Sequence, residues 1–286
     1  TGNLNTEIGV PMTLLAAVPG TAMVVLEMAM RGAGQIAELG AIAEPDVGVI
    51  VNVGPVHLEL LGSLEAIAAT KAELIAALPP SGTAVIPADE PLLEPHLRDD
   101  IEIVRFGDEP LPDALTLTIA GREPSAHMLA NARAAVAAAR AAGVEPTGRI
   151  DVELSSMRGQ RIELADGVVV VNDCYNANPM SMRAALDDLA LSTSGRRVAV
   201  LGDMLELGEG QLDYHEQIGA HARLRGVDLL VTVGPLAERM HGDHAVADAT
   251  EAAALMPGLL QPGDTVLIKA SRGIGLEAVT KALVER

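Results

Sequence analysis

Three residues of the first half suit metal or amine chemistry. Glu27 ends an apolar stretch, "AMVVLEM", that we predict to be a strand; His57 follows the apolar strand "VGVIVNV" after a Gly-Pro turn, and Lys71 lies on the helix beyond. The carboxyl ends of parallel strands meet at one edge, so Glu27 and His57 can share a divalent cation, for which both offer ligand atoms. The alternative is that both are loop residues facing water.

Lys71 also stands out by its type. The chain has three lysines, Lys71, Lys269 and Lys281, whereas seventeen arginines carry the remaining positive charge. An arginine does not lose its proton in proteins, but a lysine amine does and can then react covalently. Lys71 is therefore a candidate for amine chemistry, with a solvated surface charge as the alternative.

A second group of polar residues lies in "NDCYNANPMSMRAAL". Asp173 follows a run of four valines, Tyr175, Asn176 and Asn178 fill the turn, and Pro179 opens a helix at a position where its missing N–H is harmless. A simple helix cap does not require Asp, Tyr and two Asn together, so we interpret the segment as a binding loop. The alternative is that the asparagines form Asx turns and the tyrosine packs.

Two further groups follow later strands. The segment "LGDMLELG" places Asp203 and Glu206 after a buried strand, where they suit ribose or cation contacts but are also ordinary loop residues. The segment "KASRG" gathers Lys269, Ser271 and Arg272 at a strand end. This cationic group suits recognition of a carboxylate or another anion.

The elements that position these groups alternate between apolar strands and helices, which predicts an α/β fold with parallel sheets. In such sheets ligands bind beyond the carboxyl ends of the strands. Four of these ends are expected to converge at Asp173, Asp203, Gly234 and Lys269–Arg272. The predicted strands are 22–28, 47–53, 83–87, 101–106, 167–173, 196–203, 227–234 and 264–270. The predicted helices are 33–43, 63–78, 180–191, 212–225, 235–240, 248–256 and 275–285.

A further helix, "HMLANARAAVAAARAAG", is predicted to end at Gly143. His127 and Asn131 lie four residues apart on it and so share a face, although a bare pair of this kind is more often structural. The following "VEPTG" is interpreted as a linker. We therefore predict two domains, 1–148 and 149–286.

Composition excludes several classes of protein. Asp and Glu number 39 against 20 Lys and Arg, a net charge of -19 that disfavours a surface for nucleic acid. The single cysteine, Cys174, fits a reducing compartment, and we expect a cytoplasmic protein without a membrane insertion. Zinc spacing, a G-x-S-x-G elbow and a phosphate loop ending in Gly-Lys-Ser/Thr are absent from the sequence.

Nearly end to end, the chain resembles the Mur ligases of peptidoglycan synthesis. The segments that carry the resemblance are "GNLNTEIGVPMTLL", "LEMAMRGAGQIAEL", "HLELLGSLEAIAATKAEL", "HMLANA", "NDCYNANPMSMRAAL", "LGDMLELG" and "KASR". The resemblance implies the remainder of a P-loop-type central α/β domain, followed by a Rossmann-like C-terminal α/β domain. The "YNANP" run points to the branch whose substrates are UDP-N-acetylmuramoyl-tripeptide and D-alanyl-D-alanine. In that reaction ATP phosphorylates the tripeptide carboxylate, and the dipeptide amine attacks the acyl phosphate.

The same resemblance implies a role for each matched residue. The expected Mg2+ ligands are Glu27, His57 and Lys71, the last as a carbamate. The residues expected to contact ATP are His127, Asn131, Arg161, Asp173 and Tyr175, and those expected at the reaction centre, with His57 and Lys71, are Asn176 and Asn178. The residues expected to face the two substrates are Asn3, Asn5, Asp203, Lys269, Ser271 and Arg272.

The chain also departs from the family pattern. The UDP-binding domain and the Gly-x-x-Gly-Lys-Thr loop are both expected upstream of Thr1, the region between Phe106 and His127 is short, and Ala270 replaces the usual glycine. Without a phosphate loop the transferring phosphate lacks its donors, so we expect the chain alone to be inactive. We also expect it to be a monomer. The alternatives are a noncatalytic nucleotide-binding or regulatory module, and a related ligase that uses another amine.

Overall fold

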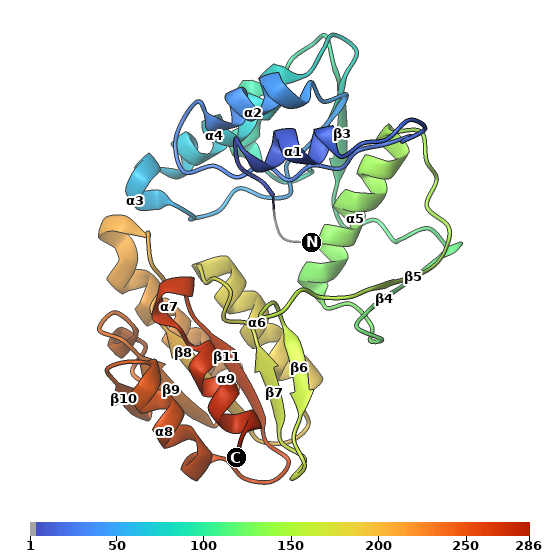
Figure 1. Cartoon of the computed structure of the whole chain (residues 1–286). Coiled ribbons are helices and arrows are strands. Elements are labelled where there is room, and N and C mark those ends of the chain that lie inside the picture. Colours follow the sequence, from blue (N-terminus) through green and yellow to red (C-terminus); the bar gives the residue numbers. More distant parts are fainter. Residues whose placement is uncertain (1–3) are drawn as a thin grey trace. The chain divides into compact units, whose positions relative to one another are not determined.

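The computed structural model describes residues 4–286 and divides the chain into two compact units (Figure 1). The first unit holds the residues up to Leu117 together with His127–Ile150, and the second holds Thr118–Ala126 and Asp151–Arg286. The candidate Asn3 lies outside the described residues. No helix within residues 4–286 is long and apolar enough to cross a membrane.

The first unit is built on a three-stranded parallel sheet in the order β1-β2-β3. The middle strand supplies the core residues Ala84, Val85 and Ile86, which are fully buried. The strands are β1 (Val47–Val49), β2 (Thr83–Pro87) and β3 (Glu102–Phe106). The helices and the 3-10 turn η1 are α1 (Gly9–Leu15), α2 (Gln35–Ala43), α3 (Leu58–Leu61), α4 (Leu64–Ala77), η1 (Pro91–His96) and α5 (Ala126–Ala141).

Helix α4, which carries Lys71, follows the predicted span closely. Ser63 is its N-cap, and the serine side chain accepts a hydrogen bond from the backbone N–H of Ala66. Ile67 and Ile75 are buried on one face, whereas the Lys71 side chain is only half-buried. The helix therefore holds Lys71 at the border between core and solvent.

The strand predicted at 22–28 is wrong. The whole stretch is irregular and joins no ladder, and Val25 is 87% exposed. An apolar run becomes a strand only when a neighbour satisfies its backbone N–H and C=O groups, and the described residues provide none here. The strand predicted at 47–53 is also shorter: its register with β2 ends at Val49, and one further hydrogen bond runs from the N–H of Ile50 to the carbonyl oxygen of Val85.

A two-stranded ribbon that the sequence analysis missed is formed by β4 (Leu115–Ile119) and β5 (Gly148–Val152). The division between the two units passes through both strands. The domain boundary predicted at residue 148 stays a prediction, since the units divide within a paired element rather than in a linker.

The second unit is a six-stranded sheet in the order β10-β9-β8-β11-β7-β6, parallel except for the antiparallel edge strand β6. Its strands are β6 (Gln160–Glu163), β7 (Val169–Asn172), β8 (Arg197–Gly202), β9 (Leu229–Val233), β10 (His244–Val246) and β11 (Thr265–Lys269). Its helices are α6 (Pro179–Ser192), α7 (Gln211–Leu224), α8 (Ala249–Leu259) and α9 (Glu277–Val284). Three 3-10 turns complete it: η2 (Gly208–Gly210), η3 (Ala237–Met240), which was predicted as a helix, and η4 (Arg272–Ile274).

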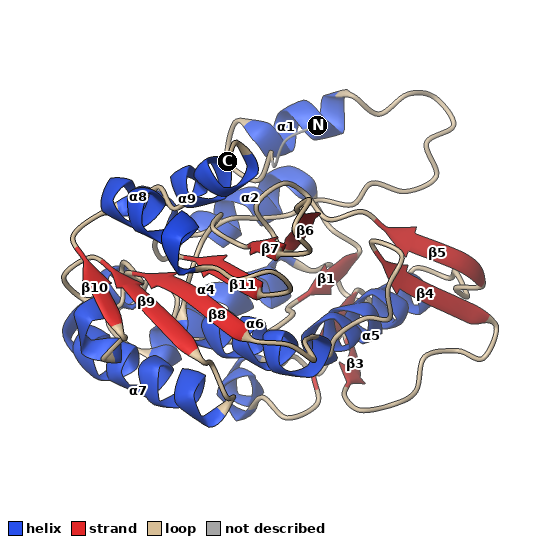
Figure 2. Ribbon diagram, turned by 90° about the horizontal axis from the view of Figure 1, so that it is seen from below, coloured by secondary structure: helices blue, strands red, loops and turns tan. Residues whose placement is uncertain are grey.

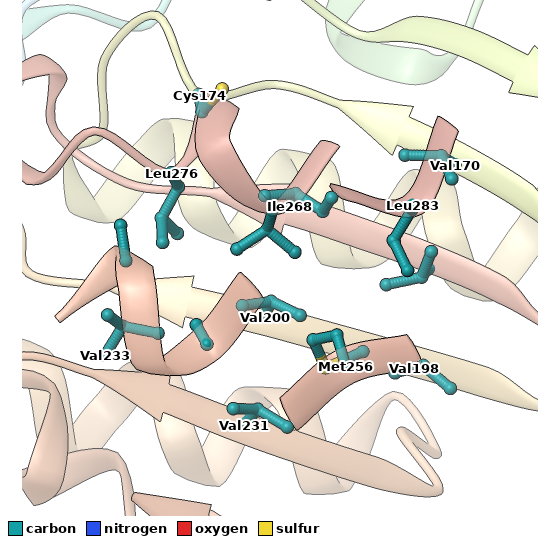
Figure 3. Packing of buried hydrophobic residues seen from close by; sticks show 14 of the residues in the cluster. Val170, Cys174, Val198, Val200, Val231, Val233, Met256, Ile268, Leu276 and Leu283 are labelled. Carbon is teal, nitrogen blue, oxygen red and sulfur yellow. The ribbon is translucent and has the colours of Figure 1, made fainter. Parts of the chain in front are cut away.

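Helices cover both faces of this sheet, with α8 and α9 on one side and α6 and α7 on the other (Figure 2). Alternate residues of β8 serve the two faces: Val198 and Val200 pack in the cluster under α8 and α9, and Ala199 and Leu201 in the cluster under α6 and α7. Figure 3 shows the first cluster, in which Met256 of α8 lies among the strand valines. Strands buried on both faces explain the valine-rich runs in the sequence.

The order of the strands creates a topological switch around β11. Strands β7 and β8 continue into α6 and α7 on one face, whereas β11, which lies between them, continues into α9 on the other. In open α/β sheets the crevice at such a switch is where ligands bind. Asp173 and Asp203 lie in the segments after β7 and β8, and Lys269–Arg272 runs from the last residue of β11 into the turn after it.

Candidate active site at the carboxyl edge of the six-stranded sheet

Lys269 is the last residue of β11 and connects that strand to the loop after β7. Its Nζ atom lies 2.7 Å from Oδ2 of Asp173 and donates to the carbonyl oxygen of Asn176 at 2.9 Å. The Lys269 side chain is only 3% exposed, so its charge depends on these two partners. The prediction that the ends of β7 and β11 converge is confirmed by this pair.

Ser271 joins three loops at the same edge. Its backbone N–H donates to the carbonyl oxygen of Asp203 at 3.0 Å. Its Oγ accepts from the backbone N–H of Leu205 at 2.9 Å and lies 3.4 Å from the carbonyl oxygen of Ala177, to which it donates. The segments after β7, β8 and β11 are thus held together by one buried serine.

Asp203 turns its carboxylate toward the loop after β9. Oδ1 accepts a hydrogen bond from the backbone N–H of Ala237 at 2.7 Å. Gly234 has φ +101°, and a Cβ there would lie 2.7 Å from the Asp203 carboxylate, so only glycine fits. Burial raises the pKa of Asp203, although hydrogen bonds from the backbone oppose the change. Its role toward a substrate stays a prediction, whereas its contacts here are those of a loop anchor.

His215 is a residue of this network that the sequence analysis did not single out. It lies on α7, fully buried, and its Nε2 accepts from the backbone N–H of Met204 at 2.9 Å. Its Nδ1 lies 2.6 Å from the carbonyl oxygen of Gln211, which assigns the proton to Nδ1 and makes the ring neutral. Burial lowers the pKa of His215 accordingly. A single histidine inside a helical pattern carries no signal of such a contact.

The segment after β7 forms the N-terminus of α6. Asn178 is the N-cap, with its Oδ1 accepting from the N–H of Ser181 at 2.9 Å and its own N–H donating to Oγ of Ser181 at 3.1 Å. Oδ1 of Asn176 accepts from the N–H of Ala177 at 2.8 Å. These are the turn contacts that stood as the alternative for the asparagines, and their place at the reaction centre stays a prediction.

Tyr175 is partly exposed and is covered by an arginine that the sequence analysis missed. The guanidinium of Arg158 lies 4.0 Å from the centroid of the tyrosine ring, a cation–π contact. Arg161, the candidate for ATP, instead lies on β6 and donates through Nη1 to Oγ of Ser192 at 3.2 Å. Nothing in the "MRGQR" sequence separates the two arginines, because their neighbours come from distant segments.

The single cysteine takes no part in the predicted chemistry. Cys174 is buried, and its Sγ donates to Oδ1 of Asn172 at 2.8 Å. Burial, with a smaller contribution from Glu277, raises the pKa of the thiol to about 11. A thiol in this state is a poor nucleophile at neutral pH.

The metal candidates belong to the first unit. Asn5 donates through Nδ2 to Oε1 of Glu27 at 3.0 Å, and Lys71 donates through Nζ to the carbonyl oxygen of Asn52 at 2.7 Å. His57 has a left-handed backbone, φ +54°, directly before α3. Among residues 4–286 no group of three or more His, Cys, Asp or Glu is arranged to hold a metal ion. A cation at this place thus requires a ligand of another kind.

Lys71 fits that requirement only after modification, because a protonated amine binds no cation. Burial lowers the pKa of Lys71, and the negative charge of Glu90 opposes this only in part. A lower pKa raises the fraction of neutral amine, which is the form that reacts with carbon dioxide. The assignment of Glu27, His57 and a Lys71 carbamate to Mg2+ stays a prediction. His127 and Asn131 follow one another by one turn on α5, as predicted.

Comparison with known proteins identifies the family to which both halves of the chain are similar. The family model described as "Mur ligase middle domain" matches residues 1–129, and the one described as "Mur ligase, glutamate ligase domain" matches residues 157–272. The crystal structure of the MurF ligase from Thermotoga maritima in complex with ADP is 29% identical. It superposes with a TM-score of 0.86 over 100% of this chain and 72% of that one.

Two sequence relatives carry the name UDP-N-acetylmuramoyl-tripeptide–D-alanyl-D-alanine ligase. The protein from Synechocystis is 37% identical over 99% of this chain and 67% of its own length. The protein from Bacillus subtilis is 35% identical over 99% of this chain and 69% of its own length. The chain thus spans about two thirds of these relatives, and it belongs to the Mur ligase family.

Proposed function

We propose that this chain carries the acceptor side and part of the nucleotide side of a ligase that joins D-alanyl-D-alanine to UDP-N-acetylmuramoyl-tripeptide with ATP. The Mur ligase family, to which the chain belongs, acts in the synthesis of peptidoglycan precursors. The observation that carries the proposal is the polar edge around β11, where Lys269, Asp173 and Ser271 connect the three loops at the switch. The names of the two relatives supply the substrates.

The proposed reaction has two steps. An oxygen of the tripeptide carboxylate takes the γ-phosphoryl group of ATP, and the bond from that phosphorus to the β-bridging oxygen breaks, which gives an acyl phosphate and ADP. The dipeptide nitrogen then attacks the acyl carbon, the carbon–oxygen bond to phosphate breaks, and the amine loses a proton. Phosphate and the new amide are the products. Charge builds on phosphate oxygens throughout, so positioned cations and N–H donors are what the site must supply.

The second unit would supply most of the contacts to the acceptor. Arg272 has a planar guanidinium suited to the dipeptide carboxylate, and Lys269 provides a buried positive charge beside the loop after β7. Asn176 and Asn178 would face the reaction centre from that loop. The predicted contacts of Asp203 and Ser271 to substrate are part of the same proposal, as is that of Asn5 to the muramoyl substrate.

The residues proposed for the nucleotide lie in both units, whereas those proposed for the cation all lie in the first unit. The residues proposed to contact ATP are His127, Asn131, Arg161, Asp173 and Tyr175; the ADP complex of the Thermotoga maritima relative supports a nucleotide site. Glu27, His57 and the Lys71 carbamate would hold Mg2+, which neutralises phosphate charge when bound. The carbamate forms when the neutral Lys71 nitrogen bonds to the carbon of CO2 and loses one proton.

Binding of candidate amines to the purified 286-residue protein tests the acceptor assignment. Isothermal titration calorimetry with D-alanyl-D-alanine, L-glutamate and diaminopimelate should show heat of binding for the dipeptide. Preference for either of the other two would replace this proposal with a ligase for another amine. The matched variant Lys281→Met changes an exposed lysine on α9 and should bind the dipeptide as the wild type does.

A noncatalytic module is the second candidate, and one observation favours it: no Gly-Lys-Ser/Thr loop occurs in the 286 residues. For that reason we propose that the chain alone releases no phosphate from ATP in the presence of both substrates. Dipeptide-dependent phosphate release would contradict this. ADP binding without dipeptide binding would favour the module. We also propose that the chain is a cytoplasmic monomer. The buried free cysteine supports the location, and light scattering tests the oligomeric state by measuring the mass.

A further inference from the structure

Arg272 forms an ion pair with a residue to which the proposed reaction assigns no role. Its Nη1 lies 3.1 Å from Oε1 of Glu277, across the 3-10 turn η4 that links β11 to α9. Glu277 is the first residue of α9, and α9 packs through Val279 and Leu283 against the core under the sheet. The carboxylate is therefore anchored to a rigid element, whereas Arg272 extends from a turn.

A second contact holds the same nitrogen. Nη1 of Arg272 also lies 3.0 Å from Sδ of Met157, in the turn before β6. The backbone carbonyl of Met157 accepts from the N–H of Tyr175 at 3.0 Å, so this turn is attached to the binding loop. Glu277 and Met157 thus both contact the Nη1 atom of the Arg272 guanidinium.

The rest of the guanidinium is left open. In the described part of the chain its side-chain contacts all involve Nη1, and the Arg272 side chain is 54% exposed. Nε and Nη2 lie on the same edge of the planar group, and their two parallel N–H bonds match the two oxygens of a carboxylate. An arginine held at Nη1 presents that edge to a ligand.

We propose that Glu277 is the positioning residue of Arg272: it holds Nη1 so that the Nε–Nη2 edge receives the terminal carboxylate of the incoming dipeptide. This inference rests on the proposed function, since it takes the dipeptide as the ligand of Arg272. An orphaned carboxylate oxygen supports it. Oε2 of Glu277 is buried and has no hydrogen-bond partner within residues 4–286, a costly arrangement that the nearby positive charge offsets.

A structural role for Glu277 makes a different prediction. An acidic residue in the first turn of a helix stabilises it through the helix dipole, by about 0.3–1 kcal/mol. Half-exposed ion pairs contribute little to stability. If Glu277 serves α9 alone, its removal lowers the stability of the protein and leaves dipeptide binding unchanged.

The experiment uses the 286-residue protein and four variants: Glu277→Gln, Arg272→Lys, the double variant, and the control Glu285→Gln. Glu285 is the C-cap of α9 and forms an exposed pair with Lys281, so its change removes the same charge at the other end of that helix. Two quantities are measured. The first is the mobility of the Arg272 Nε–Hε group in the ligand-free protein by 15N relaxation, and the second is Kd for D-alanyl-D-alanine by calorimetry.

Glu277→Gln should mobilise the Arg272 Nε–Hε group and raise Kd about tenfold, the order expected for loss of a charge-assisted contact. In the Arg272→Lys background the same change should alter Kd less than twofold, because the group it positions is absent. Glu285→Gln should resemble the wild type in both measurements.

Two outcomes overturn the inference, and they are distinguishable. If Glu277→Gln leaves the mobility of Arg272 and the Kd unchanged while Arg272→Lys raises the Kd, Arg272 binds the dipeptide without help from Glu277. If Arg272→Lys also leaves the Kd unchanged, or the wild type binds no dipeptide, the proposed function of Arg272 fails and the inference fails with it.

Discussion

The ammonium of Lys269 lies 2.7 Å from the carboxylate of Asp173; Lys269 ends β11 and Asp173 follows β7, two strands that are neighbours in the sheet but far apart along the chain. The Lys269 side chain is 3% exposed and the Asp173 side chain 23%, so little water can solvate either charge if its partner is removed. This pair lies at the carboxyl edge of the sheet, where the proposed acceptor site is located. Its energetic consequence is the first prediction.

Lys269→Met should lower the free energy of unfolding by about 2–3 kcal/mol, because it leaves the Asp173 carboxylate without its cation. Urea titration followed by circular dichroism measures the change. Lys281→Met, on an exposed side chain, should change the same quantity by less than about 0.5 kcal/mol. Equal effects of the two substitutions would show that the ion pair of Lys269 with Asp173 does not contribute to the free energy of unfolding.

Ser271→Ala should cost about 1 kcal/mol, since the backbone N–H of Leu205 loses its acceptor at 2.9 Å. The loop after β8 should also become more mobile, which hydrogen exchange of the Leu205 amide reports directly. Ser194→Ala changes an exposed serine and provides the control. Unchanged protection of that amide in Ser271→Ala would contradict the assignment of Ser271 as the link between the loops.

Gly234→Ala should destabilise the second unit by about 2–3 kcal/mol, the cost of a non-glycine residue forced into an unfavourable backbone with a steric clash. The added Cβ would meet the Asp203 carboxylate at 2.7 Å, and φ is +101°. Gly258→Ala is the matched control, because it lies in α8 and its Cβ would meet nothing within 4 Å. That variant should keep or raise the melting temperature.

The buried imidazole of His215 makes stability depend on pH. Burial lowers the folded-state pKa of His215 below the ordinary 6.5, so the unfolded chain binds the proton first as pH falls. Its contribution is fully present above pH 6.5 and is lost as pH decreases toward the folded-state pKa. Urea titrations at pH 7.5 and 5.5 should therefore show a larger loss for the wild type than for His215→Gln, which accepts the Met204 N–H without titrating. Parallel losses would exclude His215 as the source.

Lys71 should form a carbamate with carbon dioxide, since burial lowers its pKa and raises the fraction of neutral amine. In 13C-labelled bicarbonate, carbon NMR should show a carbamate signal that grows as the pH rises through the pKa of Lys71. The signal should vanish in Lys71→Arg and persist in Lys281→Arg, which removes an exposed lysine. A signal in Lys71→Arg would place the modification elsewhere.

Local patterns in the sequence predicted most of the elements near the site. The span of α4 and its Ser63 cap, the start of α6 at Pro179 and the strands that become β7, β8, β9 and β11 all follow from side-chain periodicity and capping residues. The expected convergence of strand ends placed Lys269 and Asp173 at one edge of the sheet. These signals are local, or are shared with relatives, and so can be read without knowing which strands pair.

The tertiary structure decided what depends on pairing and burial. The apolar run at 22–28 has no neighbour and stays irregular, although its composition is that of a strand. The contact of Arg158 with Tyr175, the neutral state of His215 and the ion pair of Arg272 with Glu277 arise between segments distant in the chain or from the turn that joins β11 to α9.

The amino-acid sequence by itself determined the α/β class, the family and the segments at the strand ends, because periodicity and motifs are properties of short stretches. Only the tertiary structure decided that β11 inserts between β7 and β8, which brings Lys269 to Asp173 and Ser271 to Leu205. Strand order depends on long-range packing energies that no single stretch contains. The partners of each site residue are therefore set by the folded sheet.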